Sequence, residues 1–130
     1  MNTISTINFE QPDIGVALDG LSGAELDSLE FGVIGFDADT LVRRYNALES
    51  QMAGLASTRV LGSALFTAVA PCMNNFLGAQ RFEDSAADGV ALDAVMDYVF
   101  TLRMRPSKVI LRLVASPLSA MRYVLVKRRP

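Results

Sequence analysis

The chain has 130 residues, 51% of them hydrophobic, and a net charge of −2 at pH 7, values typical of one folded domain with a single core. It has no histidine, which excludes Ser-His-Asp and Cys-His nucleophile pairs and removes the commonest metal ligand, and its one cysteine excludes an internal disulfide. Because no apolar run reaches the length of a membrane helix and no basic-then-apolar leader opens the chain, we expect a cytoplasmic protein without a membrane span.

The first 30 residues predict a short N-terminal helical cap. Apolar residues recur at helical spacing after Asp13, and a second short helical segment begins at Ser22. The core, residues 31–130, then opens with an apolar strand over 31–36 and a returning strand over 41–45.

The middle of the chain predicts helices. Short helical pieces over 46–62 break at Gly54 and Gly62, and a connecting helix over 75–87 ends near Gly89. The buried face of that helix is predicted to hold Phe76, Ala79, Phe82, Ala86 and Val90.

The last third predicts three strands, over 95–104, 108–115 and 122–127, with a turn over 116–119. Together with the first two strands they predict an α+β domain, a five-stranded antiparallel sheet with helices on one side.

Charge is unevenly distributed along the chain. Residues 1–50 carry nine acids and two arginines, whereas the residues after Asp97 include eight lysines or arginines and no acid. The basic residues alternate with apolar ones and form no stripe, so we expect them to pair with the acidic N-terminal half and not to bind nucleic acid.

The only cysteine lies in the stretch Val69-Ala70-Pro71-Cys72. A thiol between a proline and a helix-like run is exposed to the amide field of a helical first turn, which favours the thiolate and thioester chemistry. A buried cysteine that acts as a small apolar side chain is the plainer interpretation. Tyr45 and Glu49 are four residues apart, so a helical turn after Tyr45 brings a phenol and a carboxyl toward one point.

These motifs in this order resemble the photoactive yellow proteins, blue-light receptors of the PAS superfamily. The resemblance covers nearly the whole chain and has one inserted residue. It is carried by Phe9, residues 26–34, Tyr45-Asn46-Ala47 with Glu49, residues 69–72, Asp97-Tyr98-Val99-Phe100, Met104, Pro106, Lys108-Val109 and Val126-Lys127-Arg128.

The resemblance implies the PAS fold and a 4-hydroxycinnamoyl (p-coumaric acid) chromophore joined to Cys72 as a thioester. It implies that Tyr45 and a protonated Glu49 donate hydrogen bonds to the phenolate, and that light isomerises the chromophore and moves the Glu49 proton. We expect the cap then to detach, because a buried, unpaired carboxylate costs about 3–5 kcal/mol. The pocket wall is expected to contain Ile34, Ala53, Leu55, Leu65, Val69, Ala70, Met73, Phe100, Leu102 and Met104.

Four of these positions depart from the family pattern. Ala53, Leu55 and Leu102 stand where the family usually has a hydroxyl, a guanidinium and an aromatic hydroxyl, and Met73 replaces a small polar residue. A more apolar pocket disfavours the phenolate, so we expect absorption further to the blue.

Two other functions fit the same residues. One is a chromophore-free PAS module that binds an apolar ligand or a protein. The other is a protein that handles acyl thioesters through Cys72, with Glu49 as its base. As a photoreceptor the chain is expected to be no enzyme, to be a monomer or weak homodimer, and to signal to a downstream protein that the sequence does not identify.

Overall fold

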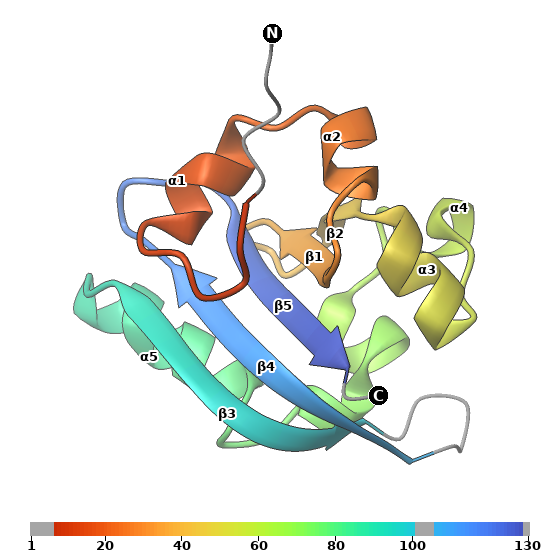
Figure 1. Ribbon diagram of the computed structural model, residues 1–130. Coiled ribbons are helices and arrows are strands. Elements are labelled where there is room, and N and C mark those ends of the chain that lie inside the picture. Colours follow the sequence, from red (N-terminus) through yellow and green to blue (C-terminus); the bar gives the residue numbers. More distant parts are fainter. Residues whose placement is uncertain (1–6, 101–105, 129–130) are drawn as a thin grey trace, which may run out of the picture.

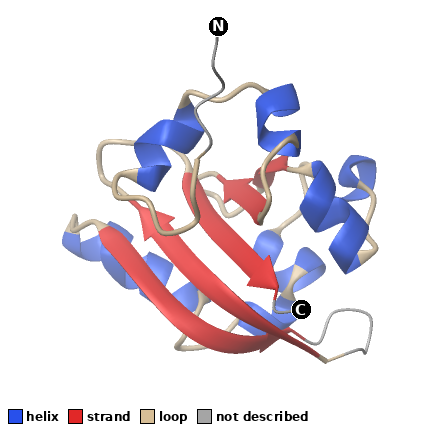
Figure 2. Ribbon diagram, in the orientation of Figure 1, coloured by secondary structure: helices blue, strands red, loops and turns tan. Residues whose placement is uncertain are grey.

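The structure, a computed structural model, describes residues 7–100 and 106–128 and contains the predicted five-stranded antiparallel sheet (Figure 2). The strand order is β2-β1-β5-β4-β3, and every pairing between neighbouring strands is antiparallel. The strands are β1 (Gly32–Phe36), β2 (Val42–Tyr45), β3 (Leu92–Phe100), β4 (Ser107–Ala115) and β5 (Arg122–Arg128). The first and last parts of the chain thus meet in the centre of one sheet, because β1 pairs with β5.

The helices are short, and two of them end at the glycines that the sequence predicts. They are α1 (Ile14–Asp19), α2 (Gly23–Asp27), α3 (Ala47–Ala53), α4 (Ser57–Val60), the π-helical turn η1 (Leu65–Val69), the 3-10 turn η2 (Pro71–Met73) and α5 (Ala79–Asp88). Ser22 starts α2 with a capping box, in which Ser22 and Glu25 each accept a backbone hydrogen bond from the other. Gly54 and Gly89 end α3 and α5 in the left-handed conformation that glycine adopts without strain.

The sheet separates two apolar layers. Along β5, Val124 and Val126 face the layer under α5 and the central turns, whereas Tyr123 and Leu125 face the layer under the N-terminal helices. This is the two-residue alternation of a strand buried on both faces. Figure 1 shows α1 and α2 on one side of the sheet and α5 on the other, so the predicted helical cap is present.

Acidic residues of the first half pair with basic residues of the last strands, as predicted. Lys127 Nζ lies 3.0 Å from a carboxylate oxygen of Glu10, and Arg128 pairs with Glu49. Arg112 also binds this half of the chain, because its guanidinium donates to the backbone carbonyls of Phe9 and Gln11.

The connecting helix differs from the prediction. It begins at Ala79 and not at residue 75, because Asn75 Oδ1 accepts the backbone N–H groups of Leu77 and Gly78 in a turn that precedes the helix. Phe76 and Val90 lie before and after the helix with 83% and 60% of their surface exposed, Ala86 is exposed within it, and the prediction that these three are buried is wrong. Ala79 and Phe82 are buried as predicted.

Candidate functional site

The first end of the candidate site is the junction between β2 and α3, where Tyr45 ends the strand and Glu49 lies in the first turn of the helix. Asn46 forms this junction and is almost fully buried. Its side-chain oxygen accepts from the backbone N–H groups of Val33 and Glu49, at 3.0 and 3.1 Å, and so caps α3. Its side-chain nitrogen donates to the carbonyls of Leu26 and Phe31, at 3.0 and 2.9 Å. One amide side chain therefore joins the cap, β1 and α3.

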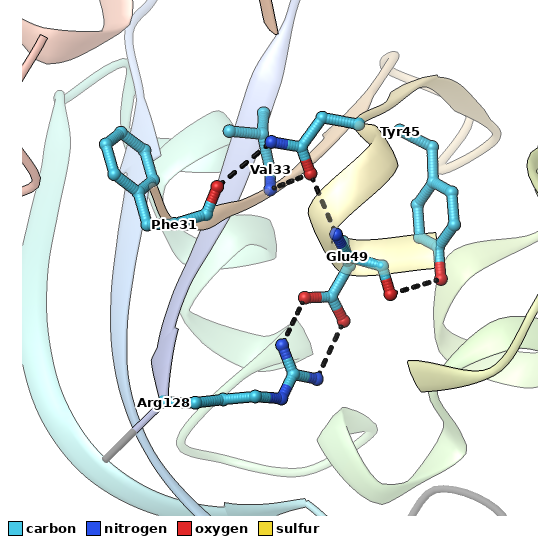
Figure 3. A network of polar contacts seen from close by, with 6 residues as sticks. Phe31, Val33, Tyr45, Glu49 and Arg128 are labelled. Carbon is cyan, nitrogen blue, oxygen red and sulfur yellow. Dashed lines mark hydrogen bonds and ion pairs between the residues drawn. The ribbon is translucent and has the colours of Figure 1, made fainter. Parts of the chain in front are cut away.

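The Glu49 carboxylate is fully buried and binds Arg128 of β5. The two guanidinium nitrogens donate to the two carboxylate oxygens, at 2.7 and 3.1 Å. Burial raises the pKa of Glu49, and the hydrogen bond and charge of Arg128 oppose that rise. Figure 3 shows the carboxylate pointing toward Arg128, not toward the Tyr45 hydroxyl. The expected convergence of phenol and carboxyl is therefore absent here, because the buried acid takes a cation as its partner.

The Tyr45 hydroxyl is a buried donor with a weak partner. Within the described residues its hydrogen bond goes to the Glu49 backbone carbonyl at 3.5 Å, the long limit of such a bond (Figure 3). Burial raises the pKa of Tyr45, and the Glu49 charge raises it further, while Arg128 opposes both. The phenol thus keeps its proton and retains the capacity to donate to a ligand anion.

The second end of the site is Cys72, in the middle of η2. Its side chain is partly buried, and its backbone carbonyl accepts from the Tyr98 hydroxyl at 2.7 Å and from Asn75 Nδ2 at 3.1 Å. Asn75 Nδ2 also donates to the Tyr98 hydroxyl at 2.7 Å. The prediction that Cys72 opens a helix is wrong, because η2 has three residues and α5 begins only at Ala79.

Most of the predicted wall residues belong to one apolar cluster that both ends of the site contact. Tyr45 belongs to the apolar cluster under the sheet, and Cys72 and Leu55 pack against it. The same cluster contains the buried wall residues Ile34, Leu65, Val69, Ala70, Met73 and Phe100. Ala53 is also buried, on α3. Leu102 and Met104 lie outside the described residues.

Sequence reasoning gave no role to two residues of this site, Asn46 and Arg128. Asn46 had a signal, because an asparagine three residues before a glutamate, directly after a strand, is a helix N-cap pattern. The sequence signal for Arg128 was weaker. A buried acid needs a cation, but only the sheet register shows which of the basic residues reaches it.

The part of the chain that the structure describes contains neither a cluster of metal ligands nor a helix that could span a membrane. Across residues 7–100 and 106–128 no group of three or more acidic or cysteine side chains is placed to hold a metal ion. None of the helices in these ranges is both long and apolar enough to cross a bilayer.

Comparison with known proteins gives close relatives, although no family model matches the chain. A photoactive yellow protein of Rhodothalassium salexigens is 33% identical over 122 residues, which are 94% of this chain and 97% of the relative. A photoactive yellow protein of Halochromatium salexigens is 32% identical over 125 residues, 96% of this chain and 99% of the relative.

Solved structures agree with these relatives. The photoactive yellow protein domain of the sensor histidine kinase Ppr from Rhodospirillum centenum superimposes with a TM-score of 0.79 at 35% identity, over 87% of this chain and 98% of that domain. The PAS domain of the RpfR quorum-sensing receptor of Cronobacter turicensis gives a TM-score of 0.59 at 14% identity, over 77% of this chain and 94% of that domain. The second similarity shows the fold alone, and the predicted PAS fold is confirmed.

Proposed function

The chain belongs to the photoactive yellow protein family of blue-light photoreceptors, and we propose that it carries a 4-hydroxycinnamoyl chromophore as a thioester on Cys72. The observation that carries this proposal is the shared apolar layer, with Cys72 at one place in it and the Tyr45 phenol at another. Relatives named photoactive yellow protein imply a chromophore; its chemical identity and its bond to Cys72 are our proposal.

The residues fit an aryl anion of this kind. Tyr45 offers a buried hydroxyl whose present acceptor is 3.5 Å away, so a closer acceptor would satisfy it better. The cluster that Tyr45 and Cys72 share is apolar, which suits an aromatic ring and a carbon-carbon double bond. When bound, the group supplies the absorption of visible light and the double bond that isomerises.

Attachment needs an activated acyl donor. The Cys72 sulfur forms a bond to the carbonyl carbon of an activated 4-hydroxycinnamate, the bond from that carbon to the leaving group breaks, and the leaving group departs with the electron pair while the thiol proton goes to solvent. Cys72 is only partly buried and lies in a short turn, which supports the proposal that such a donor reaches it.

We further propose that the cap carries the light response. Asn46 binds the carbonyl of Leu26 in the cap and the backbone N–H of Glu49 in α3, so a change at Glu49 acts directly on the cap's attachment. Hydrogen exchange of amides in residues 9–30 measures this: we expect faster exchange in illuminated, chromophore-loaded protein than in the dark. Equal exchange in both states contradicts the cap response.

We propose only the class of protein that receives the signal. The domain from Rhodospirillum centenum is part of a sensor histidine kinase. We propose that this chain likewise acts in the cytoplasm on a signalling protein and not as an enzyme.

The chromophore proposal is tested by mixing purified protein with activated 4-hydroxycinnamate and recording the intact mass and the absorption spectrum. We expect a stable adduct with a new band in the near-visible range, both absent in Cys72→Ala. If no adduct forms, a chromophore-free binding module is the better interpretation. An adduct that water removes rapidly indicates a protein that handles acyl thioesters.

A further inference from the structure

The Glu49 carboxylate binds the side chain of Arg128 and does not point toward the Tyr45 hydroxyl (Figure 3). Its two oxygens accept from the two terminal nitrogens of Arg128, and the Arg128 side chain is only 15% exposed. Parallel bonds between a planar guanidinium and a carboxylate are directional and charge-assisted, and they are stronger than bonds between neutral groups.

Within residues 7–100 and 106–128, Arg128 is the cation that pairs with the Glu49 carboxylate. β1 presents Gly32, where an added Cβ would lie 2.1 Å from Oε1 of Glu49, so the absent side chain is what lets the carboxylate lie against the strand. Among the described residues, the charged or titratable groups that face Glu49 are Arg128 of β5 and the Tyr45 phenol of β2. Lys127, the preceding residue of β5, pairs with Glu10.

A guanidinium donates and does not accept, so the pairing with Arg128 favours the ionised form of the acid. In that form Glu49 has no proton to donate to a ligand at Tyr45. Burial works in the opposite direction and favours the protonated acid, which leaves Arg128 as the group that decides between the two forms.

We propose that Arg128 is the positioning residue for Glu49: it holds the carboxylate ionised and turned away from Tyr45 in the chromophore-free protein. Binding of an aryl anion beside Tyr45 then requires Glu49 to take one proton from solvent, leave Arg128 and donate a hydrogen bond. This second step depends on the proposed function, whereas the first concerns the chromophore-free protein alone.

The first step is tested in chromophore-free protein by carbon-13 NMR of labelled glutamate carboxyls, with the Glu49 signal identified by its loss in Glu49→Gln. In Arg128→Gln we expect the titration midpoint of Glu49 to rise by about one pH unit or more, because an adjacent cation lowers a carboxyl pKa by about 1–3. Arg128→Lys retains the charge without the paired geometry and should give a smaller rise. Lys127→Gln is the matched control and should leave the midpoint unchanged.

A Glu49 midpoint that is the same in wild type, Arg128→Gln and Arg128→Lys overturns the assignment of Arg128. An equal rise in Lys127→Gln also overturns it, because the effect would then belong to the net charge of β5. If Arg128→Gln fails to fold, the comparison of Arg128→Lys with Lys127→Gln decides the question.

The second step is tested in chromophore-loaded protein by infrared spectroscopy. We expect a protonated carboxyl stretching band that appears on loading and is absent in Glu49→Gln. Loaded protein without this band contradicts the proton uptake and leaves the chromophore itself established. If no chromophore attaches, the proposed function fails, and the titration in chromophore-free protein still decides the role of Arg128.

Discussion

The two ends of the candidate site are built in different ways. At the Tyr45 end the polar groups are buried, and Asn46 and Glu49 make their hydrogen bonds within the protein, to backbone groups of the cap, β1 and α3 and to Arg128. At the Cys72 end the chain runs through two short turns, and Asn75 is exposed to solvent, where water can replace a lost bond. Folding therefore fixes the first end, while the second has the freedom that a covalent attachment point needs.

This difference predicts that one substitution has unequal costs at the two ends. Asn46→Ala removes the N-cap of α3 and takes the side-chain partner from the Val33 N–H and the Phe31 carbonyl, so we expect a loss of about 3–5 kcal/mol. Asn75→Ala, at the exposed end, should cost about 1 kcal/mol or less. Urea unfolding of both variants measures the two values, and equal losses would show that the ends do not differ in this way.

One backbone contact limits the freedom of the Cys72 end. A Cβ on Gly78 would lie 2.4 Å from the backbone oxygen of Met73, and a backbone atom cannot move aside as a side chain can. We expect Gly78→Ala to cost about 1–3 kcal/mol and to displace the segment after Cys72. Gly23→Ala is the control, because an added Cβ there meets nothing within 4 Å. A Gly78→Ala variant as stable as Gly23→Ala would show that this segment adjusts freely.

The buried acid at the Tyr45 end predicts an unusual pH dependence. The pKa of Glu49 is raised in the folded state, so the folded protein binds more protons than the unfolded one above pH 4.5, the ordinary value. The free energy of unfolding should therefore fall as the pH rises from 4.5 through the raised pKa. A tenfold difference in proton affinity between the two states corresponds to about 1.4 kcal/mol.

Glu49→Gln should remove this fall, as measured by urea unfolding at a series of pH values. Asp93 behaves in the opposite way: Arg112 lowers its pKa, and its contribution is lost as the pH falls below the ordinary value of 3.8. An unchanged slope above pH 4.5 in Glu49→Gln would assign the dependence to other groups.

Sequence patterns predicted the sheet and the ends of the helices because these depend on local chemistry. Alternation over 95–104 predicted a strand with one apolar face, which β3 shows up to Phe100, and Gly54 and Gly89 ended helices through their own backbone conformation. The capping box at the start of α2 is equally local, because Glu25, the partner of Ser22, is three residues away.

The patterns failed in two places, one decided by a residue distant in the sequence and the other by a local turn. The direction of the Glu49 carboxylate depends on Arg128, which is 79 residues away in the chain and reaches it only through the pairing of β1 with β5. Phe76 matched a helical face by spacing, but the Asn75 turn starts the helix later and leaves that ring exposed. Of the predicted site, Tyr45 and Cys72 contact one apolar cluster, and the pairing of Glu49 with Arg128 required the structure.

The smallest expected effect separates stability from positioning at the Cys72 end. Tyr98→Phe removes the hydroxyl that donates to the Cys72 carbonyl and accepts from Asn75, which should cost about 1 kcal/mol in unfolding free energy. Because this bond holds η2 in place, we also expect iodoacetamide to alkylate Cys72 a few times faster. Tyr123→Phe is the matched control: its hydroxyl binds Asp19 in the other apolar layer, so it should lose similar stability without a change in alkylation rate. If Cys72 is alkylated at the wild-type rate in both variants, Tyr98 supports the fold but does not position the attachment site. The position of Cys72 then depends on the turns η1 and η2 and not on the Tyr98 hydroxyl.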